Sequence, residues 1–450
     1  MTVPSLQDGI DRAGSAVGLL WKPGSPPWMP EVVQPEYDGW QREQVAWHES
    51  VALSDLSHHM SDTFFEGPDA TRLLDEVSAN NYRDFAIGQA KQFIAVSYDG
   101  NLVMDGILMR TGEETYTLSG VSAAQNWVKY HAERGGYDVS YETDPESSFR
   151  GGADPRLFRF QIQGPAALQV YESAFGQAAP EVRFFHSADV DWQGRRFRAL
   201  RHGMAGQAGF ELIGSWADAA AVKDALQAAG EPLGMARVGA MAYPTASLES
   251  GWIPTVVPAI YTQPELDEYR KSIGLFSFEG QKPLHGSFYS PDVRDYYVSP
   301  FELGYGRSVS FDHDFIGKAP LAVAKDRVRR VKVTLALDPG DVRAVVTGDA
   351  SDESFVLSYA RYAVESDHGV SGMTYYAGTV APAGKVLALA VVDRAAATPG
   401  TEVSVVWGEH PGGEARPDVY HAFPRLRATV HVAPYDGYAR TAYRGAAPAS

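Results

Sequence analysis

The chain is predicted to fold as an α+β protein that ends in an all-β module. Its first half repeats a strand–hairpin–helix pattern, with strands at 91–97, 102–110 and 115–119 before a helix at 123–134. Strands at 195–202 and 209–213 precede a second helix at 217–229. Such units are typical of α+β subdomains rather than of a doubly wound parallel sheet. From about Arg330, short strands separated by Gly- and Pro-rich turns predominate, which favours a β module.

The composition is that of a globular protein with a large core and an acidic surface. The chain has 450 residues, of which 44% are hydrophobic and 21% charged, and this length indicates two or three domains. The net charge of −17 argues against nucleic acid or an anionic membrane as partner. No apolar run approaches the ~18 residues of a membrane helix, and no signal sequence opens the chain. We therefore expect a cytoplasmic protein with no membrane partner.

Several classes of chemistry lack support in the sequence. Without cysteine, the chain has no disulfide, no thiolate metal site and no cysteine nucleophile. Its 12 histidines show no metal-ligand spacing, so we predict no metal site. The motifs of phosphate-binding loops, dinucleotide-binding folds and α/β-hydrolases are also missing.

The elements of the first 330 residues are predicted from periodicity and turn signals. Residues 1–35 are predicted to form an extended arm, 40–52 a helix, 62–65 a short strand, and 70–77 an amphipathic helix. The turn 98–101 joins the strands on either side of it as a hairpin. Glycines at 135 and 136 end the predicted helix at 123–134. Residues 156–163 alternate as a half-buried strand, and Gly164-Pro165 begins a helix that ends at 175.

The C-terminal module is predicted from short strands at 332–336, 343–347, 378–380, 386–392, 402–406 and 428–432. The tail that follows Tyr438 is predicted to be disordered.

The stretch from 242 to 261 is the first candidate for a site. Its prolines, which include Pro244 and Pro254, indicate a structured loop rather than a long helix or a central strand. The stretch contains Tyr243, Trp252 and Tyr261. These aromatic residues either fill the core or form the wall of a pocket with a phenolic acid in it.

Five segments resemble the T-protein of the glycine cleavage system. They lie at 55–58 (DLSH), 67–70 (GPDA), 163–165 (QGP), 201–212 (RHGMAGQAGFEL) and 311–318 (FDHDFIGK). Within that superfamily the chain is similar to the tetrahydrofolate-dependent O-demethylases of methoxy-aromatics such as vanillate and syringate. That similarity is carried by the segments at 58–60 (HHM), 90–92 (AKQ), 159–165 (RFQIQGP), 200–204 (LRHGM), 248–254 (LESGWIP), 258–262 (PAIYT), 295–298 (DYYV) and 407–409 (WGE).

The resemblance implies a T-protein-like arrangement of three domains. Two ferredoxin-like α/β subdomains, interleaved within residues 1–325, would surround a central folate channel and form the catalytic region. Residues 326–440 would form a β-barrel or jelly-roll domain, and residues 441–450 a disordered tail.

The resemblance also implies the cofactor and its contacts. Tetrahydrofolate would be the methyl acceptor, and Glu211 would bind its pterin ring. Gln161 and Trp252 would line the folate channel, with Gln163 and Tyr261 as further cofactor-binding candidates. Gln161 and Gln163 share one face of a strand, so either could reach the ligand while the other stabilises the turn that follows.

Tyr243 is the candidate catalytic acid, since the resemblance places it beside the methyl ether oxygen. A phenolate leaves readily only if it is protonated or strongly hydrogen-bonded as the C–O bond breaks. A neutral tyrosine matches it in pKa and contributes ~10²–10⁴-fold in rate as a general acid. His59 and Asp105 are the other catalytic candidates: His59 would face the pocket, with His58 on the opposite face, and Asp105 would either be structural or orient the folate.

The methyl donor is expected to be a small methoxy-aromatic molecule, either a methoxyphenol or a methoxybenzoate. Vanillate-type relatives carry an arginine near the start of the 123–134 helix, whereas this chain has Val121 and Ser122 there. His285 is a candidate to hold a carboxylate instead. Two alternatives stay open, namely an onium or N-methyl donor and a non-catalytic folate-binding protein. The sequence does not distinguish a monomer from a homo-oligomer.

Overall fold

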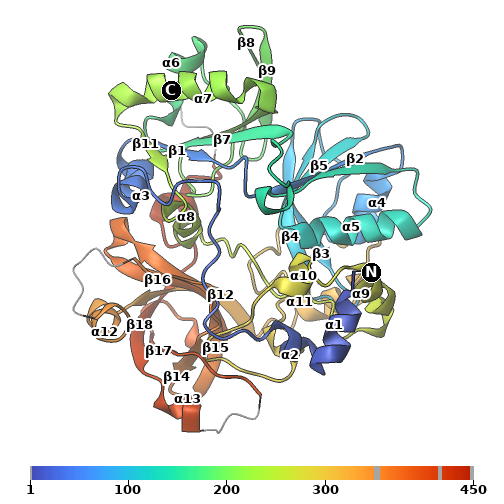
Figure 1. The fold of residues 1–450 in the computed structure, drawn as a ribbon, viewed down its shortest axis with the longest axis vertical. Helices are drawn as coiled ribbons and strands as arrows, with labels where there is room; N and C mark the ends of the chain where they lie inside the picture. The colour runs from blue at the N-terminus through green and yellow to red at the C-terminus, as the bar shows by residue number, and fades with distance from the viewer. Residues whose placement is uncertain (1–2, 349–354, 414–417, 446–450) are drawn as a thin grey trace.

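Three β-sheets and the helices around them make up the fold (Figure 1). The computed structural model describes residues 3–348, 355–413 and 418–445. Figure 1 shows one sheet at the top, a second at the right and a barrel at the lower left. The predicted α+β class with a C-terminal β-barrel is therefore confirmed. No helix in these ranges has the length and apolar character needed to cross a bilayer.

The elements follow one another along the chain with these bounds. The helices are α1 (Leu6–Ala13), α2 (Ala16–Leu20), α3 (Trp40–Glu49), α4 (Ala70–Val77), α5 (Ser122–Arg134), α6 (Ala167–Phe175), α7 (Ala219–Gly230), α8 (Ala242–Ser250), α9 (Asp267–Ser272), α10 (Phe278–Gln281), α11 (Lys318–Lys325), α12 (Pro339–Val342), α13 (Asp418–Ala422) and α14 (Gly437–Thr441). The strands are β1 (Ala52–Asp55), β2 (Ser61–Glu66), β3 (Ala90–Val96), β4 (Leu102–Arg110), β5 (Thr115–Gly120), β6 (Ser140–Asp144), β7 (Leu157–Gln163), β8 (Ser187–Trp192), β9 (Arg195–Leu200), β10 (Gly209–Ser215), β11 (Ala236–Val238), β12 (Arg330–Leu337), β13 (Leu357–Ser358), β14 (Ala363–Ser366), β15 (Gly369–Val380), β16 (Lys385–Asp393), β17 (Glu402–Val406) and β18 (Arg425–Val432).

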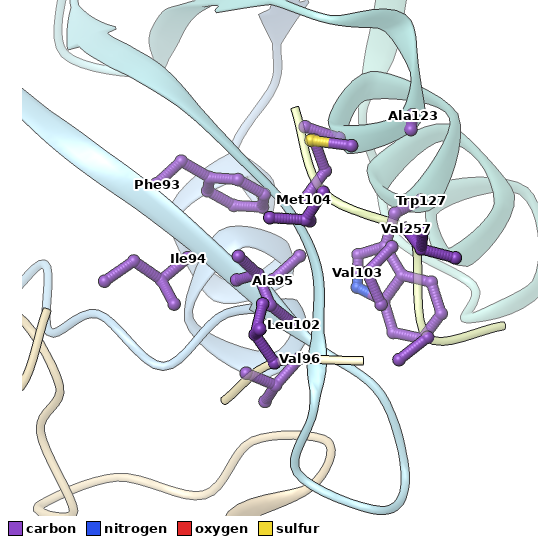
Figure 2. Close-up of a cluster of buried hydrophobic side chains, with 14 of the residues drawn as sticks. Phe93, Ile94, Ala95, Val96, Leu102, Val103, Met104, Ala123, Trp127 and Val257 are labelled. Atoms are coloured by element: carbon purple, nitrogen blue, oxygen red, sulfur yellow. The ribbon is translucent and has the colours of Figure 1, made fainter. Parts of the chain in front are cut away.

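The first sheet has five antiparallel strands in the order β3-β4-β5-β2-β6. Helix α5 packs on it through Trp127, whose indole lies with the β4 residues Val103 and Met104 in one apolar cluster (Figure 2). The indole Nε1 of Trp127 donates a hydrogen bond of 3.0 Å to the carbonyl of Val77, at the end of α4. A single aromatic side chain therefore ties two helices to the sheet.

The second sheet has six strands in the order β11-β1-β7-β10-β9-β8, and only the β1–β11 pair is parallel. Its apolar face packs against α6 and α7 in a core of its own. The alternation along β7 leaves Gln161 opposite Glu211 of β10 in the antiparallel register. This pairing directs two polar residues to the same face of the sheet.

The third sheet closes into a barrel because β15 pairs with both β14 and β16. Around the barrel the strands run β15-β14-β17-β18-β12-β16, and the short β13 pairs with residues 377–378 of β15, on the edge that β14 occupies nearer the start of that strand. Closure leaves the barrel strands without free edges. The predicted domain boundary near 325 falls between α11 and the first barrel strand, β12.

The predicted loop at 242–261 is wrong in its first part, because residues 242–250 form helix α8. Pro244 is the third residue of that helix, where the backbone N–H that proline lacks would have had no intrahelical partner. Gly251 ends the helix in the left-handed conformation, with φ of 72°. The prolines after it, Pro254 and Pro258, do lie in irregular chain.

Three further predictions differ from the structure. The arm predicted at 1–35 contains two short helices, α1 and α2, each begun by a serine cap. Residues 343–347, predicted as a strand, form a π-helical turn. The tail predicted to be disordered from 441 is folded as far as 445, because Tyr443 is buried and hydrogen-bonded to Gly203. Residues 446–450 lie outside the described ranges.

Replacing Trp127 with alanine is expected to cost about 3–5 kcal/mol of unfolding free energy, since it opens a cavity in the core. It also leaves the Val77 carbonyl without its donor. Denaturant titration followed by circular dichroism measures the change. Phe149→Ala is the control, because that ring is 66% exposed and its loss should shift stability by no more than about 0.5 kcal/mol. Equal effects of the two changes would contradict this packing.

Candidate active site

A cavity of about 1300 Å³ lies where the two open sheets, α8 and the irregular segments meet. Pockets of ~300–1,000 Å³ commonly hold one drug-sized ligand, so this cavity has room for two small molecules. Residues from β4, β7, β10 and α8 line it, together with the 26–29 stretch and the C-terminal segment around Tyr443. Of the predicted site residues, the cavity brings together His59, Asp105, Gln161, Glu211, Tyr243 and Trp252.

One wall of the cavity is built around a buried ion-pair network. Arg159 of β7 donates from Nη1 to Glu211 Oε1 at 2.6 Å and from Nη2 to Asp62 Oδ1 at 2.8 Å. Gln161 donates from Nε2 to the other oxygen, Glu211 Oε2, at 2.8 Å. Each carboxylate oxygen of Glu211 therefore accepts one hydrogen bond from protein and keeps a lone pair for a ligand.

The charge of Glu211 is fixed by these neighbours. Burial alone would raise the pKa of this carboxyl group, but the charge of Arg159 and the hydrogen bonds of Gln161 and Arg159 hold it below its usual range. Glu211 is therefore an ionised acceptor at the cavity surface. A carboxylate of this kind suits a planar ligand edge that presents N–H donors.

Another part of the cavity lining presents neutral polar groups. Tyr243 of α8 and His59 lie with ring centroids 4.4 Å apart, and within the described chain no residue hydrogen-bonds the Tyr243 hydroxyl. Both ring nitrogens of His59 are buried without a partner in the same described ranges. Burial raises the pKa of Tyr243, with the charge of Glu211 acting in the same direction, and burial lowers the pKa of His59 to about 4. Both side chains are therefore uncharged at neutral pH.

Asp105 holds other residues in place. Its Oδ2 accepts hydrogen bonds from Gln92 at 2.8 Å, from Trp252 Nε1 at 3.0 Å and from the Tyr305 hydroxyl at 3.0 Å. Burial raises the pKa of Asp105, against these three hydrogen bonds. The carboxyl group thereby fixes the Trp252 indole against the cavity.

Two predicted cofactor-binding residues do not line the cavity. Gln163 accepts from the backbone N–H of Ala205 at 2.9 Å and donates to the carbonyl of Gln207 at 3.1 Å, so it shapes the 203–207 turn. Tyr261 donates its hydroxyl proton to the carbonyl of Glu279 at 2.7 Å. The polar atoms of both side chains are hydrogen-bonded to protein rather than available to a ligand.

Sequence reasoning assigned no role to two residues that the structure brings to the site. Arg159 shares the strand face of Gln161, two positions away, and this period-two pattern was a usable signal. His202 lines the cavity with both ring nitrogens buried and unpartnered within the described ranges. Nothing local in the sequence distinguishes His202 from a packed core histidine.

The low pKa of His59 predicts a specific pH dependence of stability. The unfolded chain takes up this proton near pH 6.5, but the folded protein does so only near pH 4, so stability falls as the pH drops through this interval. In His59→Gln about 3 kcal/mol of that loss should disappear. Unfolding free energies at pH 7 and pH 4 measure it. The exposed His421→Gln is the control, and identical pH profiles for His59→Gln and the parent would contradict a buried neutral imidazole.

Comparisons with known proteins agree with this architecture. The model of the GCVT N-terminal domain matches residues 19–256. The chain is 38% identical over 450 residues to syringate O-demethylase from Sphingobium sp. (strain NBRC 103272 / SYK-6), covering 98% of this chain and 97% of that protein. It is 26% identical to sesamin methylene transferase from Sinomonas sp. (strain No.22), over 89% of each.

A solved structure shows the same fold. The glycine cleavage system aminomethyltransferase T from Bartonella henselae superposes with a TM-score of 0.62 at 18% identity, over 90% of this chain and 91% of that chain. The family predicted from the segments of the sequence is thus confirmed by a domain match and by a relative that spans nearly the whole chain. The protein belongs to the GCVT-domain family, within the aminomethyltransferase superfamily.

Proposed function

We propose that this protein is a tetrahydrofolate-dependent O-demethylase, which moves the methyl group of an aryl methyl ether to N5 of tetrahydrofolate. The products would be a phenol and 5-methyltetrahydrofolate. Family membership supports a folate-dependent methyltransferase. Two relatives named for syringate O-demethylation and sesamin methylene transfer support an aromatic ether as donor.

The residues of the charged wall fit the pterin of tetrahydrofolate. Glu211 is ionised and keeps one lone pair on each oxygen, which suits the N–H edge of a pterin ring. Gln161 holds the same carboxylate in position, and the aromatic ring of Trp252 lines the cavity. When bound, tetrahydrofolate supplies the N5 nucleophile, and the proton that N5 loses balances the one gained by the phenol.

The observation that carries the proposal is the free hydroxyl of Tyr243 in the cavity that also contains Glu211. Its raised pKa keeps the proton on Oη, and within the described chain no protein acceptor competes for that proton. An ether oxygen placed against this hydroxyl receives a hydrogen bond that strengthens as negative charge develops on the leaving phenolate.

His59 and Asp105 complete the arrangement in different ways. The neutral imidazole of His59, 4.4 Å from the Tyr243 ring, offers one donor and one acceptor to the ring substituents of the methyl donor. Asp105 acts through Trp252 and is a positioning residue rather than a catalytic one. Trp28 and Met29, which also line the cavity, cover its donor end.

Tyr243→Phe is expected to lower the rate of 5-methyltetrahydrofolate formation by ~10²–10⁴-fold, because the leaving phenolate loses its proton donor. Single-turnover assays with syringate isolate this step from product release. Tyr171→Phe is the matched control, since that buried ring belongs to α6 and packs in the core of the six-stranded sheet, away from the cavity, and should retain the parental rate. An unchanged rate in Tyr243→Phe would instead favour an onium or N-methyl donor, which leaves as a neutral molecule.

Glu211→Gln should weaken tetrahydrofolate binding by at least ~10-fold, because a charged acceptor for the pterin N–H groups becomes a neutral amide. Calorimetric titration with tetrahydrofolate measures the dissociation constant. Affinity for the methyl donor, titrated separately, should change much less. Unaltered tetrahydrofolate affinity would show that the pterin lies elsewhere.

A further inference from the structure

Three lysines line the cavity, and one of them differs from the others in its surroundings. Lys91 lies within the field of Asp84 and Asp75, and Lys129 within that of Glu279 and Glu133. None of the three lysines forms an ion pair within the described ranges, but only burial and the charge of Arg361 act on Lys282. It is therefore the cavity lysine with no carboxylate near enough to act on its charge.

Lys282 is held in an enclosed position. The residue is 8% exposed, and its Nζ donates to Thr255 Oγ1, also on the cavity wall, at 2.7 Å. The ammonium group lies 5.6 Å from the centroid of the Tyr359 ring and 5.9 Å from that of Phe278. The hydroxyl of Thr255 accepts from one of the three N–H groups, and the two ring contacts accept no conventional hydrogen bond. Two N–H donors are therefore available to a ligand.

A second buried cation stands close to Lys282. Arg361 is 1% exposed and donates through Nη1 to the carbonyls of Tyr359 and Tyr375, each at 2.9 Å. Its Nε and Nη2 find no partner among the described residues. Burial, together with the charge of Arg361, lowers the pKa of Lys282 well below its ordinary value, and a carboxylate bound at Nζ would act in the opposite direction. Two buried cations without an acid are costly, and an anion in the cavity would offset that cost.

The position of Lys282 relates it to the catalytic tyrosine. The Tyr359 ring that it faces stacks on Tyr376 at 4.9 Å, and the Tyr376 hydroxyl bonds to the carbonyl of Pro244. Pro244 is the residue after Tyr243. Tyr359 also lines the cavity and, after burial and the charge of Glu211, acts to raise the pKa of Tyr243, so Lys282 and Tyr243 share Tyr359 as a neighbour.

We propose that Lys282 binds a carboxylate on the aromatic ring of the methyl donor, so that the enzyme acts on methoxybenzoates in preference to neutral methoxyphenols. This inference rests on the proposed function. The other candidate for this contact, His285, already pairs its Nδ1 with Glu409 at 3.0 Å. Val121 and Ser122, at the start of α5, line the cavity and carry no charge. They stand where the resemblance to vanillate-type enzymes would place an arginine.

The test compares syringate with syringyl alcohol, in which CH₂OH replaces the carboxylate. Lys282→Met should lower kcat/KM for syringate by ~10–100-fold, mainly through KM, because a charge-assisted hydrogen bond is lost. The value for syringyl alcohol should stay within about threefold of the parent, since that donor makes no ion pair. Lys129→Met is the matched control. The ratio of its kcat/KM for syringate to its kcat/KM for syringyl alcohol should equal that of the parent.

Two further measurements separate the possible failures. Calorimetric titration of syringate without tetrahydrofolate tests the carboxylate contact alone, and tetrahydrofolate titration of Lys282→Met shows that this variant is folded. If syringate binding depends on Lys282 but no methyl transfer occurs, the proposed function fails and the carboxylate site stands. If Lys282→Met lowers kcat/KM equally for acid and alcohol, or for neither, the carboxylate site is overturned.

Discussion

A single guanidinium group joins the two open sheets that enclose the cavity. Arg159 on β7 bonds to Asp62 on β2 of the five-stranded sheet and to Glu211 on β10 of its own sheet. Both carboxylates are buried, so removal of the arginine would leave two uncompensated charges, a change that typically costs several kcal/mol. The separation of the sheets and the ionised state of Glu211 therefore depend on the same side chain.

The part of the cavity lining formed by Tyr243 and His59 is uncharged, in contrast to the Arg159 network. Tyr243 and His59 carry no charge at neutral pH and leave polar atoms without protein partners within the described chain. Each unsatisfied buried group costs ~1–3 kcal/mol, so this wall is less stable empty than filled. An ether oxygen that takes up these hydrogen bonds recovers that energy. The cavity thus combines an ionised acceptor, Glu211, with uncharged donors at Tyr243 and His59.

Local patterns predicted most of the fold, whereas the family resemblance supplied the site candidates, of which six of eight line the cavity. The β3–β4 hairpin and helix α5 follow from turn chemistry and periodicity, which act over a few residues. Helix α8 does not follow from the proline content of its segment, because proline usually ends a helix. Pro244 lies in the first turn, where a helix tolerates proline. The Arg159–Glu211 pair spans 52 positions in the chain, and only the tertiary fold brings those residues together. Gln163 has the sequence context of a ligand contact but turns toward protein.

The cation that holds an anionic donor in this cavity can come from more than one segment of the lining. With a net charge of −17, the protein repels an anionic donor at long range, so such a donor needs a local cation to be held. The start of α5 and the segment after α10 are neighbours, since Asn126 of α5 donates to Glu279 of α10 at 3.1 Å. Both segments line the cavity, so a cation on either one faces the same space. The missing arginine near Val121 therefore does not argue for a neutral donor once Lys282 is placed in the cavity wall.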